Sequence, residues 1–123
     1  MAELNQEGYQ ALRDYVVSSA STPNSWGYIE VYDDTSSAIT RINIVSDDRC
    51  GWSDIDGDNV LKIELTLSGG DSDINTPVTI SESAIWTQSS GGIRVTQKEN
   101  FAEATLSEDG DTVNITHTIK LPQ

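Results

Sequence analysis

The strongest constraint on the fold is a strict alternation of apolar and polar residues in two stretches of the chain. In the first, residues 60–68, the apolar positions are Leu61, Ile63, Leu65 and Leu67. In the second, residues 112–121, they are Val113, Ile115, His117, Ile119 and Leu121. Successive side chains of a β-strand point to opposite faces, so this period places each set on one face. The two stretches therefore predict two strands, each with one face in a core.

Short segments of strand composition, separated by turn residues, fill most of the remaining chain. They are residues 26–32, 38–45, 77–86, 93–101 and 102–106. The turn 89–92 predicts a hairpin between two of them, and residues 109–111 predict a second hairpin turn. Residues 47–59 are expected to form a loop. About seven or eight short strands linked by turns predict an antiparallel β-sandwich of jelly-roll or immunoglobulin-like kind.

One helix is predicted, over residues 5–18. Asn5 can cap its start, and Tyr9, Leu12 and Val16 recur at helical spacing. The helix would cover one open edge or end of the sandwich. A chain of 123 residues is long enough for one core, so the prediction is a single domain over residues 1–123.

Acidic residues dominate the charge of the chain. Twenty Asp and Glu residues against seven Lys and Arg residues give a formal net charge of −13. We therefore expect neither nucleic acid nor an anionic membrane surface as a partner, because both need a basic footprint. The acids fall in turns between Thr-rich strands, which suits a halophilic protein whose self-repulsion is screened by salt. An ordinary acidic β domain with Asp-rich turns is the alternative interpretation.

The hydrophobic content of 36% indicates a small core. Such a chain can need a partner subunit to complete its core. The single cysteine, Cys50, can form no disulfide within the chain, and we expect it to be a small buried side chain.

The best candidate for a metal site is the run 54–59, in which Asp54, Asp56 and Asp58 alternate with other residues. Alternating carboxylates can converge on Ca²⁺ or Mg²⁺. The run departs from an EF-hand loop, because its glycine comes two positions early and no glutamate occupies the twelfth position. An Asp-Gly turn leading into the 60–68 strand is the preferred interpretation. No other cofactor is expected.

No arrangement of residues typical of catalysis is found in the sequence. His117 is the only histidine, and no nucleophile or orienting acid stands at a recognisable spacing from it. A packed or interface histidine is the expected role, and the chain is not predicted to be an enzyme. A small hydrolase using Asp54 and Asp56 is the weakest alternative, because these residues are too close in sequence to flank a scissile bond.

The three tryptophans, Trp26, Trp52 and Trp86, leave a binding function open. Their rings could stack on sugars in a carbohydrate-binding module, and Trp52 is the one expected in a loop. Aromatic residues more often anchor cores and protein interfaces.

Four separated stretches share their order and spacing with one known family. They are residues 4–14 (LNQEGYQALRD), 80–86 (ISESAIW), 89–92 (SSGG) followed by Phe101, and 112–119 (TVNITHTI). They resemble the opening helix, a strand, its turn and the terminal strand of small virion structural proteins from tailed viruses of bacteria and archaea. The chain departs from the family pattern at Ala84, Trp86 and His117, where glycine, phenylalanine and tryptophan are usual.

The resemblance implies a non-enzymatic protein located in the virion, as a capsid turret or decoration or as a tail or baseplate component. It would act as a homo-oligomer, a trimer or a larger ring, together with other virion proteins. Tyr9, Trp86, Phe101 and His117 are the predicted core or interface anchors. A carbohydrate-binding module for host-surface attachment is the alternative function. The family has no catalytic residues to transfer.

Overall fold

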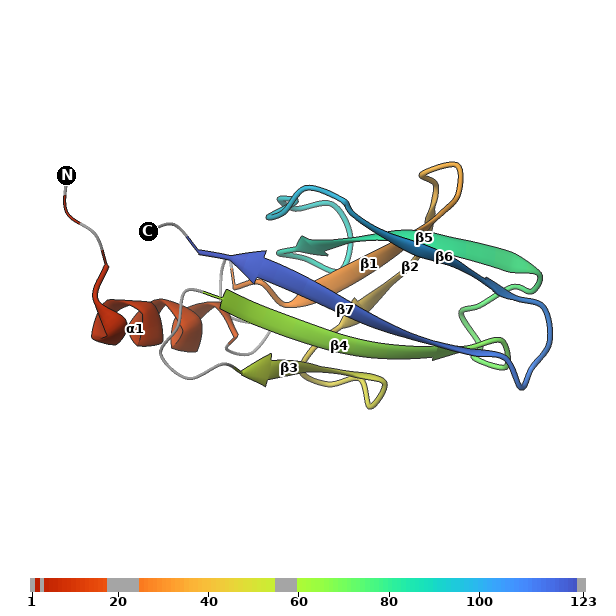
Figure 1. Cartoon of the computed structure of the whole chain (residues 1–123), viewed down its shortest axis with the longest axis horizontal. Coiled ribbons are helices and arrows are strands. Elements are labelled where there is room, and N and C mark those ends of the chain that lie inside the picture. The colour runs from red at the N-terminus through yellow and green to blue at the C-terminus, as the bar shows by residue number, and fades with distance from the viewer. Residues whose placement is uncertain (1, 3, 18–24, 55–59, 122–123) are drawn as a thin grey trace.

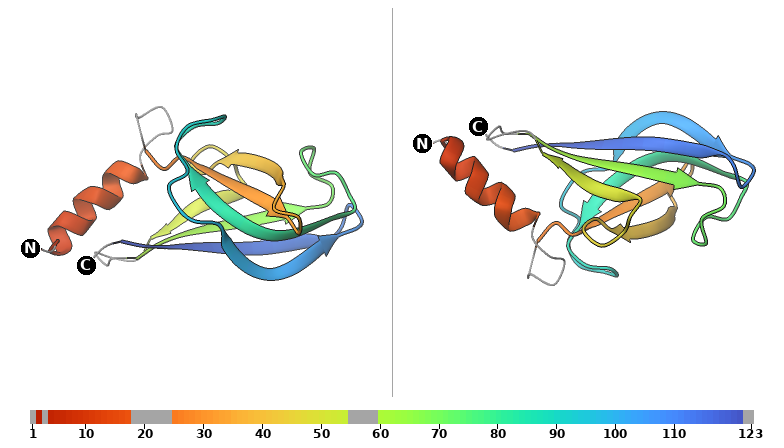
Figure 2. Two further views of the ribbon diagram at one scale, coloured as in Figure 1. Left: turned by 90° about the horizontal axis from the view of Figure 1, so that it is seen from above. Right: turned by 90° about the horizontal axis from the view of Figure 1, so that it is seen from below.

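A computed structural model of the chain describes residues 2, 4–17, 25–54 and 60–121. It contains one helix and two antiparallel sheets packed face to face (Figures 1 and 2). The four-stranded sheet has the order β2 (Ala38–Asn43), β1 (Tyr28–Asp33), β5 (Val78–Trp86) and β6 (Glu99–Leu106). The three-stranded sheet has the order β3 (Cys50–Asp54), β4 (Val60–Ser68) and β7 (Thr112–Lys120). The predicted β-sandwich with one helix is therefore confirmed.

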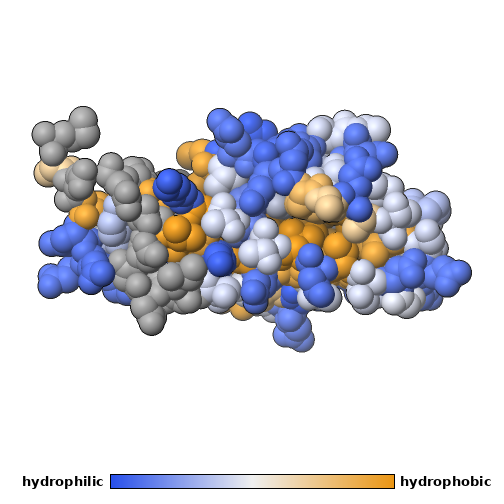
Figure 3. Space-filling view, in the orientation of Figure 1, coloured by the Kyte–Doolittle hydropathy of each residue, from blue (hydrophilic) through white to orange (hydrophobic). Residues whose placement is uncertain are grey.

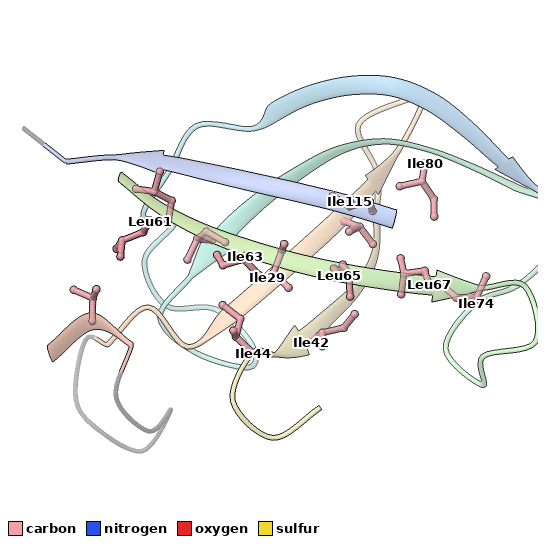
Figure 4. Packing of buried hydrophobic residues seen from close by; sticks show 14 of the residues in the cluster. Ile29, Ile42, Ile44, Leu61, Ile63, Leu65, Leu67, Ile74, Ile80 and Ile115 are labelled. Atoms are coloured by element: carbon pink, nitrogen blue, oxygen red, sulfur yellow. The ribbon is translucent and has the colours of Figure 1, made fainter. Parts of the chain in front are cut away.

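The core lies between the two sheets, where the alternating positions of the sequence meet. The four predicted apolar residues of β4 are each 2% exposed or less: Leu61, Ile63, Leu65 and Leu67. Figure 4 shows them along one side of β4, with Ile29 of β1 and Ile42 of β2 approaching from the other sheet. Burial of these side chains is the main force that holds the two sheets together.

Three local hairpins build the sandwich, formed by β1–β2, β3–β4 and β5–β6. The turn predicted at 109–111 is present, because the N–H of Asp111 donates to the carbonyl of Glu108 at 3.1 Å. It does not form a hairpin, however. β6 pairs with β5, whereas β7 pairs with β4 in the opposite sheet. The prediction was wrong because turn residues reverse the chain without fixing which strands pair.

Two other predictions about strands need correction. Residues 47–59 were expected to be a loop, but Cys50–Asp54 forms β3 and pairs with β4. The return strand of the 77–101 hairpin was expected to start at Ile93, but β6 starts at Glu99. In the segment from Ile93 to Glu99, the only pairing is an isolated bridge between Arg94 and Trp86. The preceding turn uses Gly92 at φ 78°, where a Cβ would also lie 2.9 Å from the Thr87 hydroxyl.

The helix α1 (Gln6–Val16) begins as predicted, with Asn5 as its N-cap. The Asn5 side chain accepts a hydrogen bond from the N–H of Gly8 at 2.8 Å. Val17 is the C-cap, and residue 18 lies outside the described residues. Figure 2 shows α1 at one end of the sandwich, where Tyr9 and Val16 join the core. Within the described chain, no helix is long and apolar enough to cross a membrane.

Candidate functional site

One buried polar group of the interior is centred on His117, which lies on the inward face of β7 and is 1% exposed. Its Nδ1 is 2.7 Å from the hydroxyl of Ser83 on β5 and 3.1 Å from a carboxylate oxygen of Glu99 on β6. Its Nε2 is 3.3 Å from the hydroxyl of Thr96. The fold thus brings three polar partners to one histidine. We call these four residues the His117 cluster.

The environment fixes the charge of His117. Burial lowers the pKa of this imidazole from its ordinary 6.5 to about 4, so the ring is neutral at pH 7. The hydrogen bonds also assign its tautomer. The Glu99 carboxylate can only accept, so the ring proton belongs on Nδ1. The Thr96 hydroxyl already accepts the N–H of Ile85 at 3.2 Å, and so donates to Nε2.

The cluster superficially matches a hydroxyl–imidazole–carboxylate triad, but its geometry does not support nucleophilic catalysis. In a triad the nucleophile and the carboxylate contact opposite nitrogens of the imidazole, whereas Ser83 and Glu99 both contact Nδ1. Ser83 is also 0% exposed, so its hydroxyl is out of reach of a substrate. Thr96 is on the correct nitrogen, but an imidazole with a pKa of about 4 is a weak base at pH 7. What the arrangement does is tie β7 to β5 and β6 across the core.

A groove of about 490 Å³ lies beside this cluster. One wall is the irregular segment 95–99 and the other is the end of β7, residues 117–121, with Trp26 also contributing. The Glu99 carboxylate crosses between the walls and accepts the backbone N–H of Thr118 at 3.0 Å. The backbone N–H of Thr118 on β7 is therefore hydrogen-bonded to a side chain and not to a neighbouring strand.

A second polar group covers the outer face of the four-stranded sheet, and it contains the predicted anchor Trp86. Arg41 lies 4.0 Å from the centre of the Trp86 ring and pairs with Glu30 at 3.0 Å. The Trp86 indole N–H donates to the hydroxyl of Tyr32 at 2.9 Å, and Lys98 lies over the Tyr32 ring at 4.1 Å. Burial, with the hydrogen bond to Glu30, raises the pKa of Tyr32 to about 12. Trp86 therefore points away from the core, and one face of its ring is already occupied.

The other predicted anchors lie in or against the core. Tyr9 on α1 is 7% exposed and belongs to the hydrophobic core cluster. Phe101 on β6 is partly buried and packs against that cluster. Both positions fit a core role, while Trp86 and its neighbours form a separate surface group.

The third charged group is centred on Arg49, which precedes β3. Its guanidinium contacts Asp47 at 2.8 Å, Asp71 at 3.1 Å and Asp73 at 2.7 Å. The hydrogen bonds from Arg49 lower the pKa values of Asp47 and Asp73 and raise the pKa of Arg49 itself. One arginine therefore offsets part of the negative charge of three carboxylates that come from two separate loops.

Replacing Arg49 with glutamine is expected to lower the free energy of unfolding by about 2 kcal/mol at low salt, because three close carboxylates lose the cation that all of them contact. The loss should shrink in molar salt, which screens repulsion over a few ångströms. Urea denaturation at both salt levels measures the effect. Arg94→Gln, at an exposed position, is the control with the same charge change. An equal effect of the two substitutions would contradict the prediction.

The predicted metal site lies largely outside the described residues. Asp54 ends β3, and Asp56 and Asp58 lie outside the described residues. Among the residues that the structure does describe, no group of three or more His, Cys, Asp or Glu side chains could hold a metal ion. Cys50 is partly buried, and burial raises the pKa of its thiol to about 12, which keeps the thiol protonated at neutral pH.

Trp52, proposed as a loop residue for sugar stacking, lies instead within β3 opposite Ile63. Its indole nitrogen is buried without a hydrogen-bond partner among the described residues. The cavity beside it, between α1 and the three-stranded sheet, has about 70 Å³ and is lined partly by Gln10, Asp14 and Leu61. This space is far smaller than ordinary ligand pockets, which start near about 300 Å³.

The chain finds no match when it is compared with protein-family models, with curated proteins and with solved structures.

Proposed function

We propose that this chain is a non-enzymatic structural subunit of a virion. It would assemble as repeated copies into a capsid turret or decoration, or into a tail or baseplate component. The resemblance of four ordered stretches to small virion proteins suggests this class. The His117 cluster is compatible with it, because its residues connect strands across the core and its buried imidazole, with a pKa of about 4, is a weak base at pH 7.

The observation that carries the proposal is that the sandwich is open on both sides. The four-stranded sheet ends in β2 and β6, and the three-stranded sheet ends in β3 and β7. Within the part of the chain that the structure describes, each of these strands has one side without a strand partner. Figure 3 shows hydrophobic areas along the middle of one face, interrupted and bordered by more hydrophilic residues. Natural proteins cover such edges, and neighbouring copies are one means of doing so.

The carbohydrate-binding alternative has less support from the structure. Trp52 lies in a strand with its indole nitrogen buried, and one face of Trp86 is occupied by Arg41. Trp26 lines the groove beside β7 and is the remaining tryptophan for this function. A glycan-array screen in molar salt addresses it directly, and binding abolished by Trp26→Ala in a folded protein would favour this alternative.

The oligomeric mass in molar salt tests the main proposal. We expect a mass of at least three times the 13.4 kDa chain by light scattering after size exclusion. Lowering the salt should dissociate and then unfold the protein, because a net charge of −13 is screened only at high ionic strength. A stable monomer in molar salt would count against assembly. Stability that does not depend on salt would remove the halophilic part of the proposal.

A further inference from the structure

The β7 edge, by which we mean the side of β7 that faces away from β4, is blocked at one position by a side chain from the other sheet. The backbone N–H of Thr118 donates to Oε2 of Glu99 at 3.0 Å, and so points away from β4. Among the described residues, no strand pairs with β7 on this side. Unpaired edge groups can pair with the backbone of another molecule, and natural proteins obstruct such pairing with charged side chains.

Glu99 is held in this position at both ends of its side chain. Its backbone lies in the ladder of the four-stranded sheet, opposite Ser83 of β5. The carboxylate oxygen that accepts the Thr118 N–H also lies 3.1 Å from Nδ1 of His117, a ring that is 1% exposed. A side chain that is already ordered by these contacts loses little further conformational entropy when it blocks the edge. The block is therefore built into the folded chain.

The residues around Glu99 add to the obstruction. Segment 95–99 forms one wall of the 490 Å³ groove, and the end of β7 forms the other, so this segment stands beside the last residues of the edge. Lys120, further along the same edge, is exposed, and lysine is one of the residues that natural sheets use against edge pairing. A strand that added here would have to displace Glu99 from Thr118 and would bring its own backbone beside Lys120.

We propose that Glu99 prevents the β7 edge from pairing with a strand of a second copy of this chain. Loss of its carboxylate frees the Thr118 N–H, and a strand of another copy can then add to the edge by backbone hydrogen bonds. This role does not rest on the proposed virion function. In an assembly of the proposed kind, it directs the contacts between copies to surfaces other than the end of β7.

Glu99→Ala is the decisive variant. We expect species larger than the unmodified protein to appear at a concentration at least about tenfold lower, measured by light scattering at pH 7 in molar salt. Glu103→Ala removes the same side chain from an exposed position on the same strand, so it should associate like the unmodified protein. This control separates the freed edge from the general loss of one negative charge. Glu99→Gln keeps an oxygen that can accept the Thr118 N–H, so it should also behave like the unmodified protein.

Alanine at position 99 also removes the contact with His117, so a double variant separates the freed edge from a loss of stability. Thr118→Pro, added to Glu99→Ala, removes the freed N–H itself and obstructs an added strand. The β4–β7 ladder keeps its hydrogen bonds, because this N–H is directed to Glu99 and not to β4. We expect the double variant to associate like the unmodified protein. Circular dichroism and urea denaturation establish that each variant is folded.

Three results would overturn the role of Glu99. The first is association of Glu99→Ala at the same concentration as the unmodified protein. The second is equal association of Glu99→Gln and Glu99→Ala, and the third is increased association that persists in the folded double variant. None of these results bears on the proposed assembly, which is tested by the mass of the unmodified protein. A monomeric unmodified protein in molar salt counts against assembly and leaves the role of Glu99 standing.

Discussion

Replacing Ile63 with alanine is expected to lower the free energy of unfolding by about 2–5 kcal/mol. Ile63 is 0% exposed in the middle of β4, opposite Trp52 of β3 and His117 of β7. Its side chain therefore fills the space where all three strands of this sheet meet the core. Alanine would leave a cavity that strands held on both sides cannot close. Because the chain has a small core, this loss is a large part of its stability.

Ile93→Ala is the matched control, because Ile93 is 61% exposed and loses the same atoms. Its effect should stay within about 0.5 kcal/mol. Urea denaturation in molar salt measures both variants under one condition, since urea leaves the ionic strength unchanged. Equal midpoints for the two variants would mean that β4 does not occupy the centre of the sheet.

His117 is expected to make the stability of the protein depend on pH between about 6.5 and 4. In the unfolded chain the imidazole takes up a proton near its ordinary pKa of 6.5, whereas in the folded protein its pKa is about 4. Between these values the unfolded state binds more protons, so the free energy of unfolding falls as the pH is lowered. The full loss is about 3 kcal/mol. Glu99, 3.1 Å from Nδ1, favours the charged ring and makes this an upper bound.

Two measurements check this effect. Because His117 is the only histidine, its ring protons give one NMR titration curve, and the expected midpoint lies near the folded value. Urea denaturation of His117→Gln should then show a flatter dependence on pH over the same window. The acids whose pKa values are lowered, such as Asp33 and Asp111, lose their contribution below their ordinary range in both proteins. A ring that titrates near pH 6.5 in the folded protein would contradict the buried placement.

The parts of the fold that could be predicted from sequence are those in which local pattern and burial agree. The 60–68 strand has the predicted bounds, and its apolar set is buried. Asn5 caps α1, because a short polar side chain before a helical pattern has one favourable use. His117 is packed as expected for a member of the apolar stripe of β7.

The remaining features depend on contacts between distant segments. β3 carries Gly51 and Asp54, so its composition resembles a loop, and only pairing with β4 makes it a strand. The partners of His117 come from residues 83, 96 and 99. No spacing in the sequence indicates this, because the meeting depends on which sheet β6 joins. Arg49 likewise contacts two acids of one distant loop, Asp71 and Asp73, which lie 22 and 24 residues further along the chain.

The pairing of β7 with β4, instead of with the preceding β6, has a consequence for the order in which the chain folds. Partners in this ladder are 44 residues apart at Ser68 and Thr112, and 60 residues apart at Val60 and Lys120. Closing such loops costs chain entropy before any contact offsets it, and domains rich in distant pairings fold in milliseconds to seconds. The β1–β2 and β3–β4 hairpins can form early from neighbouring residues, whereas β7 docks late. Until it docks, β4 is itself an uncovered edge, so newly made chains pass through a state that can pair with the wrong partner.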